Sequence, residues 1–170
     1  LLVTVSVIAV LAALAIPNFK TSVANNRSSG AGEELVTALN LARNEAIRRG
    51  SYVSICSSVD GTACLSPANW AKGWLVFQDA ATSDTATSSV STVIRYWNDL
   101  PATIVVTAIK TPSTAIDYVR FNNLGVLAKA QNDLQVREIN VSLTSCKGQQ
   151  KSKITVGLVG LITSTKVNCP

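Results

Sequence analysis

The sequence predicts an α+β protein in which one long N-terminal helix precedes an antiparallel β domain. Three observations predict this fold class. An apolar run opens the chain at residues 1–16, a stripe of apolar residues at helical spacing follows up to residue 50, and β-branched or aromatic segments separated by turn residues fill the rest. With 170 residues, 47% of them hydrophobic, the chain is long enough for one buried core beside this helix.

The opening run has no charged side chain, and only Thr4 and Ser6 carry a hydroxyl group. A helix that is apolar all round has to be buried in lipid or in protein. Its sixteen residues span roughly 24 Å, slightly less than the roughly 30 Å hydrocarbon core of a bilayer, so we expect a truncated or processed start. An uncleaved signal peptide is the alternative. The residues expected to serve membrane anchoring and assembly are Leu1, Leu2, Val3, Val5, Val7, Ile8, Val10, Leu11, Leu14, Ile16 and Pro17.

The helix should change character after Pro17, which cannot donate the next helical hydrogen bond and so is expected to kink or end the first segment. Two glycines and two serines within residues 25–32 predict a soft joint. Gly50 is a plausible C-cap. The apolar stripe expected to pack on a globular domain is formed by Leu35, Leu39, Ala42 and Ala46. We therefore divide the chain into an apolar helical half at 1–17, an amphipathic half at 18–50 and a β domain at 51–170.

The β domain is expected to contain about seven strands. Asp60-Gly61 and residues 122–125 are turn signals, and the Ala-, Thr- and Ser-rich residues 80–91 predict an exposed loop. A slip in the alternation of apolar residues predicts a bulge near Arg137 and Glu138. The candidate strand segments are 52–55, 74–77, 93–97, 103–109, 116–121, 134–143, 154–158 and 161–167.

Four cysteines behind an export-type N-terminus favour disulfides in an oxidising compartment over a metal site. We expect Cys56 to pair with Cys64 and Cys146 with Cys169, because each pair flanks a local turn or hairpin. Loops of these lengths should contribute roughly 2.5 and 3.5 kcal/mol on a chain-entropy model. Pairing between the two halves of the chain remains open at this point.

The composition argues against an enzyme. The chain contains no histidine, so the commonest general base is missing and no residue of that kind can activate a cysteine. The acidic residues after the helix, Asp79 among them, show no pairing rule and are interpreted as solvated surface. No cofactor or metal is expected, because no phosphate-binding loop or metal motif occurs. Tyr96, Trp74 and Trp97 are interpreted as core residues, with Trp70 as the exposed exception.

Residues 11–19 read Leu-Ala-Ala-Leu-Ala-Ile-Pro-Asn-Phe. This stretch resembles the end of the N-terminal segment of type IV pilins and type II secretion pseudopilins. In that family a prepilin peptidase cuts before a Phe-Thr-Leu-x-Glu start, which would lie immediately before Leu1. The resemblance implies that the apolar helix first anchors the subunit in the membrane and later forms the filament core. It also implies prepilin peptidase as the processing enzyme and methylation as a modification.

Further motifs resemble the GspH/FimT/FimU branch of that superfamily. They are ELVTALNLARNEAIRRG at 34–50, VSIC at 53–56 and NWAKGWLVF at 69–77, in this order. The resemblance implies a pilin-like domain of two small sheets in a minor pilin that primes or caps a type IV pilus. Its expected partners are major and minor pilins or pseudopilins. The expected location is the bacterial inner membrane with a single span, then the pilus at the cell surface, with the β domain periplasmic or extracellular. A type II secretion pseudopilin is the alternative.

The positive charge lies mostly at the C-terminal end. Residues 129–170 carry six basic and two acidic groups of a chain with net charge +5. Such a patch can attract DNA phosphates, and Lys147, Lys151 and Lys153 are the candidate contacts. Relatives that act as DNA receptors in transformation use a Gly-Arg-x-Arg motif, where this chain has Gly-Leu-Ile-Thr at 160–163. Both arginines are missing, so the lysines are interpreted mainly as protecting a strand edge.

Overall fold

The computed structural model describes residues 2–98, 100–110, 112–128, 136–146 and 149–169, without the side chains of residues 2, 5–21 and 24. Within these residues, one helix is followed by nine strands and a short 3-10 helix, η1 (Trp70–Lys72). Their bounds are α1 (Leu2–Arg49), β1 (Val53–Ser57), β2 (Trp74–Asp79), β3 (Val90–Trp97), β4 (Ile104–Lys110), β5 (Thr114–Ala115), β6 (Tyr118–Phe121), β7 (Arg137–Leu143), β8 (Gln150–Val156) and β9 (Ile162–Asn168). The predicted α+β class is confirmed, with nine strands in place of about seven.

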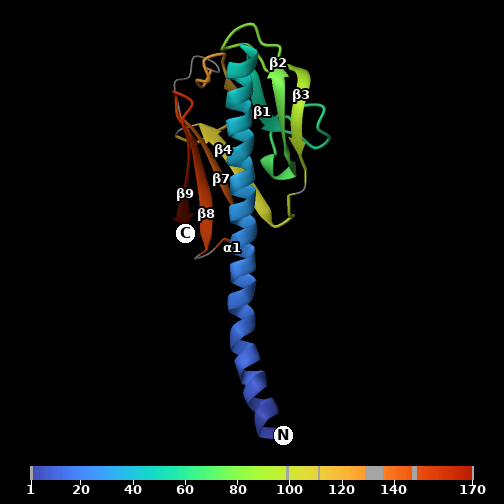
Figure 1. Ribbon diagram of the computed structural model, residues 1–170, viewed down its shortest axis with the longest axis vertical. Helices are drawn as coiled ribbons and strands as arrows, with labels where there is room; N and C mark the ends of the chain where they lie inside the picture. Colours follow the sequence, from blue (N-terminus) through green and yellow to red (C-terminus); the bar gives the residue numbers. More distant parts are fainter. Residues whose placement is uncertain (1, 99, 111, 129–135, 147–148, 170) are drawn as a thin grey trace.

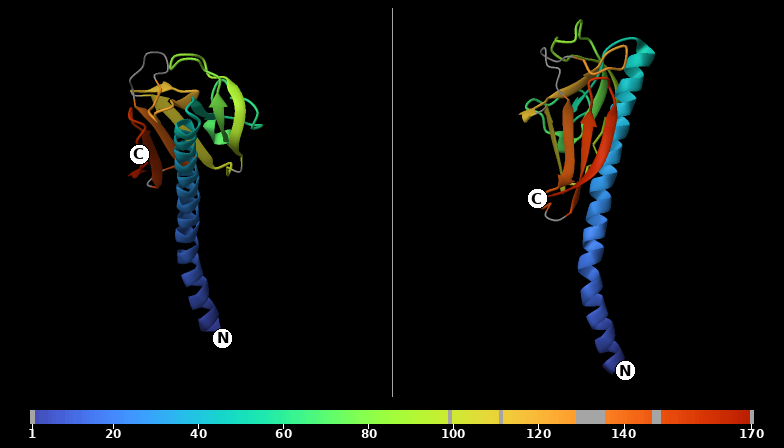
Figure 2. Two further views of the ribbon diagram at one scale, coloured as in Figure 1. Left: turned by 45° about the horizontal axis from the view of Figure 1, so that its top comes forward. Right: turned by 90° about the vertical axis from the view of Figure 1, so that its left-hand side faces the viewer.

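Helix α1 is continuous over 48 residues. Its N-terminal half stands clear of the β domain, and its C-terminal half lies along it (Figures 1 and 2). Of the kink or end expected at Pro17, the end does not occur, and the helix continues through residues 18–49 as expected, without interruption at 25–32. Pro17 has no amide hydrogen, so the helix lacks one hydrogen bond at this position. Among the residues described, no helical stretch is both long and apolar enough to cross a membrane.

The strands form two antiparallel sheets that α1 contacts together. One sheet has the order β3-β2-β1-β6 and the other β5-β4-β7-β8-β9. Register shifts occur between β2 and β3, at Val76/Phe77 and at Gln78/Asp79. The bulge expected near Arg137 and Glu138 is wrong, because β7 begins at Arg137 and pairs with β4 and β8 without a shift. Leu134, which suggested that bulge, lies outside the described residues.

The core lies where the inner faces of both sheets meet the helix. Among the α1 residues whose side chains the structure describes, Ser28 is the first that is buried, and the whole predicted stripe is inaccessible to solvent. Trp70 is also buried, contrary to expectation, because its indole Nε1 donates a hydrogen bond to the Ile116 carbonyl oxygen at 3.2 Å. The stripe residues are Leu35, Leu39, Ala42 and Ala46, and they share one cluster with Val53, Ile55, Trp74, Ile139 and Ile154.

A helical glycine lies where the helix closely approaches the sheet. A Cβ atom added at Gly32 would lie 2.7 Å from Ser152 Oγ and 2.8 Å from Ser152 Cβ on β8. Gly30, one half-turn earlier, has no such neighbour within 4 Å. The glycines that suggested a soft joint therefore differ in role, because Gly32 lets the helix pack directly on the sheet.

This difference predicts opposite signs for two alanine substitutions. Gly30→Ala should raise the free energy of unfolding by up to about 1 kcal/mol, because alanine is the better helix former. Gly32→Ala should lower it by about 1 kcal/mol or more, because overpacking outweighs the same helical gain. Urea unfolding of the full chain in detergent measures both, and equal effects of the two substitutions would contradict the close approach.

Candidate interaction surfaces and the ion pair that supports them

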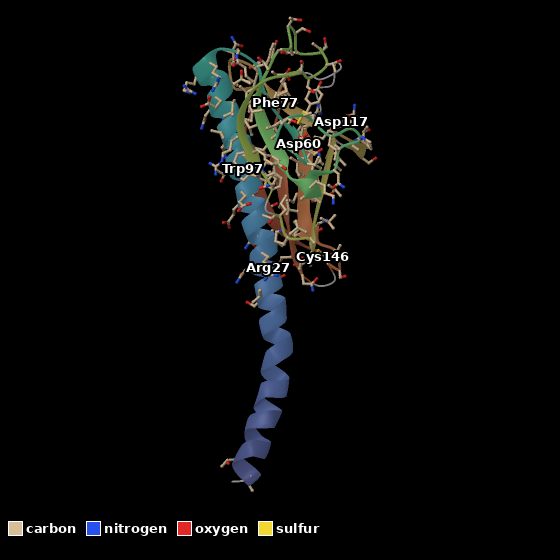
Figure 3. The ribbon with its side chains drawn as sticks, turned by 90° about the vertical axis from the view of Figure 1, so that its right-hand side faces the viewer. Arg27, Asp60, Phe77, Trp97, Asp117 and Cys146 are labelled. Atoms are coloured by element: carbon tan, nitrogen blue, oxygen red, sulfur yellow. A yellow bond between two sulfur atoms is a disulfide. The ribbon has the colours of Figure 1, made fainter. Side chains whose placement is uncertain are left out.

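The N-terminal half of α1 projects beyond the β domain (Figure 1). Its described residues Val3, Ser22, Asn26 and Arg27 are exposed, Val3 to 76%. Of the residues expected in membrane anchoring and assembly, Val3 alone has a described side chain, and Leu1 lies outside the described residues altogether. Figure 3 shows Arg27 at the level where the helix leaves the β domain. A helix face of this kind is available to other helices or to lipid.

The opposite end of α1 is fixed to the β domain by its cap. Gly50 has φ +61°, and the amides of Gly50 and Ser51 donate to the carbonyls of Ile47 and Ala46, both at 3.3 Å. These two hydrogen bonds form the pattern of a glycine C-cap, as the sequence predicted. Arg49 Nη1 donates to Gln78 Oε1 of β2 at 3.2 Å. The helix end is therefore held against a strand.

A glutamate neutralises part of the charge at this end. Glu45 accepts hydrogen bonds from Arg48 Nη2 and from Arg49 Nε, both at 2.6 Å. These bonds, with Arg48 first in effect, hold the pKa of the Glu45 carboxyl below its usual value. Residues 43–49 nevertheless carry three arginines against this one carboxylate, so the helix end keeps a positive excess.

A buried ion pair fixes the loop that follows β2. Both side chains of Asp79 and Arg120 are inaccessible to solvent, and Arg120 Nε donates to Asp79 Oδ2 at 2.9 Å. Arg120 Nη2 also lies 2.9 Å from Oδ2, although outside hydrogen-bonding alignment. Ser54 Oγ donates to the same oxygen at 2.6 Å, and the amides of Ala81 and Ser89 donate to Oδ1. A carboxylate with this many donors is compensated for its burial.

The guanidinium group extends the network into the loop itself. Arg120 Nη1 donates to the carbonyl oxygens of Ser83, Asp84 and Ala86 at 3.3, 3.2 and 2.8 Å. The same group lies over the rings of Tyr118 and Tyr52, at 5.0 and 5.7 Å from their centroids. A hydrogen bond to Asp84 and partial burial raise the pKa of the Tyr52 hydroxyl. Residues 80–89, although expected to be a plain exposed loop, are thus anchored to a buried charge.

Sequence reasoning missed both members of this pair. Asp79 is the last residue of β2, one residue after the apolar run 74–77, and Arg120 lies between Val119 and Phe121 on β6. Charged residues inside apolar strands are a usable signal, because such charges are rarely buried without a partner. Their pairing could not be predicted from the sequence, since it depends on β1 lying between β2 and β6 in the sheet.

Two disulfides close local loops, Cys56–Cys64 and Cys146–Cys169, which are the pairs expected from the spacing. Within the first loop, the Asp60 carboxylate accepts hydrogen bonds from the amide and hydroxyl of Thr62 and from the Ala63 amide. Led by the Thr62 amide, these bonds lower the pKa of the Asp60 carboxyl to about 2. Gly61 follows with φ +73°, which confirms the turn predicted at Asp60-Gly61.

The C-terminal lysines do not gather into one patch in the described part of the chain. Lys151 and Lys153 occupy alternate positions of β8 opposite to the buried Ser152, whereas Lys166 pairs in register with Ser152 and so projects from the other face. Lys153 Nζ lies 2.7 Å from Glu138 Oε2. That contact, with a second bond from Asn140, lowers the pKa of the Glu138 carboxyl. Lys147 lies outside the described residues.

The described residues contain no group of three or more His, Cys, Asp or Glu side chains arranged to hold a metal ion. A small open cleft of about 210 Å³ lies beside the helix cap, lined by Gly50, Ser51, Tyr52 and Asn123. The residues that line this cleft include no nucleophile with an activating base.

Comparison with known proteins agrees with this architecture. Residues 31–160 match the family model described as type II transport protein GspH. The type IV minor pilin FimU of Pseudomonas aeruginosa PAO1 is similar in structure, with a TM-score of 0.62 at 20% identity over 82% of this chain and 89% of that chain. A second crystal form of FimU has a TM-score of 0.57 at 20% identity, over 81% of this chain and 91% of that chain. The minor pseudopilin EpsH of the Vibrio cholerae type 2 secretion system has a TM-score of 0.52 at 12% identity, over 82% of this chain and 96% of that chain.

At these identities the solved structures show a common fold. The search of curated protein sequences gave no match.

The buried ion pair makes a testable difference to stability. Arg120→Met should lower the free energy of unfolding by about 3–5 kcal/mol, because it leaves Asp79 buried without its cation. Adding Asp79→Leu should recover part of that loss. As a control, Lys153→Met at the half-exposed pair with Glu138 should cost less than about 1 kcal/mol. Urea unfolding of the four proteins measures this, and a double variant no more stable than Arg120→Met would contradict the account.

The Asp60 turn predicts a pH-dependent contribution to stability. Because the folded pKa of about 2 lies below the ordinary aspartate pKa of 3.8, the contribution is present above pH 3.8 and is lost as the pH falls toward 2. Asp60→Asn should therefore lower the urea midpoint relative to wild type at pH 5, and the difference should shrink at pH 2.5. A difference of equal size at both values would show that the carboxylate charge is not involved.

Proposed function

Since the chain belongs to the GspH family, with residues 31–160 matching its model, we propose that it is a minor pilin of a type IV pilus that helps to prime or cap the filament. The chain is a structural subunit and not an enzyme. The observation that carries the proposal is the family match combined with a continuous helix whose first half extends beyond the β domain. Its function is then assembly through that helix.

The proposed mechanism uses the helix in two environments in succession. Residues 1–17 first lie in the bacterial inner membrane as a single span and are later buried against the helices of other pilin subunits. Residues 18–50 continue the rod onto the β domain of 51–170, which faces the periplasm or the cell exterior. The absence of charged side chains from residues 1–16 supports this step, because a charge buried among packed helices or in lipid is costly. A prepilin peptidase would process the precursor.

A type II secretion pseudopilin is the second candidate. The family description and the similarity to the EpsH fold favour it, just as the similarity to the FimU fold favours a pilus subunit. Both candidates use the same helix and the same β domain. They differ in the machine that the subunit joins.

DNA reception is less well supported by the geometry. Of the three candidate lysines, Lys153 is engaged by Glu138, and the nearby Lys166 projects from the opposite face of the sheet. A DNA-binding role would require Lys147, Lys151 and Lys153 to supply salt-sensitive affinity. A gel shift by the full chain that does not change when all three become Gln would remove this candidate.

The proposal is tested by deleting the gene and complementing it with variants of the full chain. Wild type should restore surface pili, Leu14→Arg should abolish their restoration, and Thr107→Arg on the exposed outer face of β4 should restore them fully. The reason is that position 14 lies in the segment proposed to be buried among helices, whereas position 107 does not. Pili should be counted by electron microscopy, beside assays of protein secretion and transformation.

The three assays separate the candidates. Loss of secretion alone would identify a pseudopilin, and loss of transformation with intact pili would identify a DNA receptor. Restoration by Leu14→Arg equal to wild type would contradict assembly through the helix.

A further inference from the structure

Five large apolar side chains are exposed together at the pole where α1 ends. They come from the end of the helix, from the turn at 122–127 and from the β8–β9 turn at 157–161, and each is 40–73% exposed. We call this cluster the distal patch. Its residues are Ile47, Leu124, Leu158, Val159 and Leu161.

The three segments of the distal patch are in direct contact. A Cβ atom at Gly125 would lie 2.6 Å from Ile47 Cδ1, and one at Gly160 would overlap the Gly125 carbonyl oxygen. The Leu127 amide donates to the Leu158 carbonyl oxygen at 3.1 Å. Helix end and turns therefore form one continuous surface.

The patch is also held in a fixed shape. Arg43 Nε donates to the Gly125 carbonyl oxygen at 3.0 Å, which fastens the 122–127 turn to the helix. Gly125 and Gly160 both have positive φ, at +71° and +76°, and each closes its turn by donating to the residue three positions earlier. A surface that is already ordered loses little entropy when it binds.

Exposed turns are normally built from polar residues, so an ordered apolar cluster on two turns needs a reason. The distal patch has a positive rim. Its three segments, 43–49, 122–127 and 157–161, contain three arginines and one glutamate, and that glutamate is already bonded to Arg48 and Arg49. The complementary surface is apolar and flanked by carboxylates.

A protein fits this description better than a lipid surface. The patch lies at the end of α1 opposite to the N-terminus (Figures 1 and 2). At 1.5 Å per residue, about 65 Å of helix separates Thr4 from Ile47. If residues 1–17 occupy the membrane, as proposed above, the distal patch points away from it.

We propose that the distal patch docks a second protein through a segment of apolar side chains flanked by Asp or Glu. This inference rests on the proposed function for the direction in which the pole faces. It assigns the protein a second contact, separate from the helix that enters the assembly. The subunit would then contact other subunits through α1 and the second protein through the distal patch.

The test starts with the full chain in the bacterium that produces it. A photo-crosslinking amino acid replaces Leu161 in one strain and, as a matched control, the exposed Val93 in another. Position 161 should crosslink to one protein that position 93 does not capture, and the captured segment should contain apolar residues beside carboxylates. Crosslinks to lipid only, or equal patterns from both positions, would overturn the proposal.

The second step measures affinity between the full chain in detergent and the purified captured protein. Leu124→Ser with Leu161→Ser should weaken binding at least tenfold, and Arg48→Glu at least threefold, whereas Val93→Ser and Lys72→Glu should leave it unchanged. Circular dichroism checks that each variant is folded. Unchanged affinity of either the double variant or Arg48→Glu would overturn the proposal.

Pilus counts distinguish this failure from failure of the proposed function. If the chain still assembles but the distal patch variants bind as wild type does, only the docking inference is lost. If Leu14→Arg also restores assembly, the proposed function itself is wrong.

Discussion

A single helix has to be half buried by its own β domain and half left for other molecules, and the rest of the structure depends on this division. The division is visible in residue size along α1. From Ser28 onward the buried face is made of Ser, Ala, Gly and Leu, and Gly32 allows direct contact with Ser152 of β8. Small residues at the start of the contact and leucines further along let the rod lie against both sheets without bending away. The projecting half needs no such pattern.

The β domain supports this rod through long-range contacts rather than local ones. The glycine cap ends the helix where Arg49 reaches Gln78 of β2, and β2 in turn carries Asp79 into the buried pair with Arg120. That pair orders the hydroxyl-rich residues 80–89, because one guanidinium nitrogen donates hydrogen bonds to three of their carbonyl oxygens. Specific polar contacts, in addition to the apolar core, therefore fix the helix, the strand and the loop relative to one another.

Features set by local sequence were predictable, and features set by topology were not. The stripe at Leu35 and Leu39, the cap at Gly50 and the turn at Asp60-Gly61 are determined within a few residues, and all were anticipated. Asp79 was interpreted as surface because its partner lies 41 positions away. Trp70 was expected to be exposed because only the folded chain brings the Ile116 carbonyl to its indole. The GspH family could be anticipated from motif order, whereas the distal patch joins three segments that no motif connects.

The central claim is that α1 is one uninterrupted rod whose first half stands free of the β domain. The most direct measurement is the distance between spin labels at Val3→Cys and Asn44→Cys in the full chain in detergent, by pulsed electron paramagnetic resonance. A continuous helix predicts a narrow distribution centred at about 60 Å, from 41 residues at 1.5 Å each. A distribution centred well below that value would mean that the first half folds back onto the β domain, and would contradict the account.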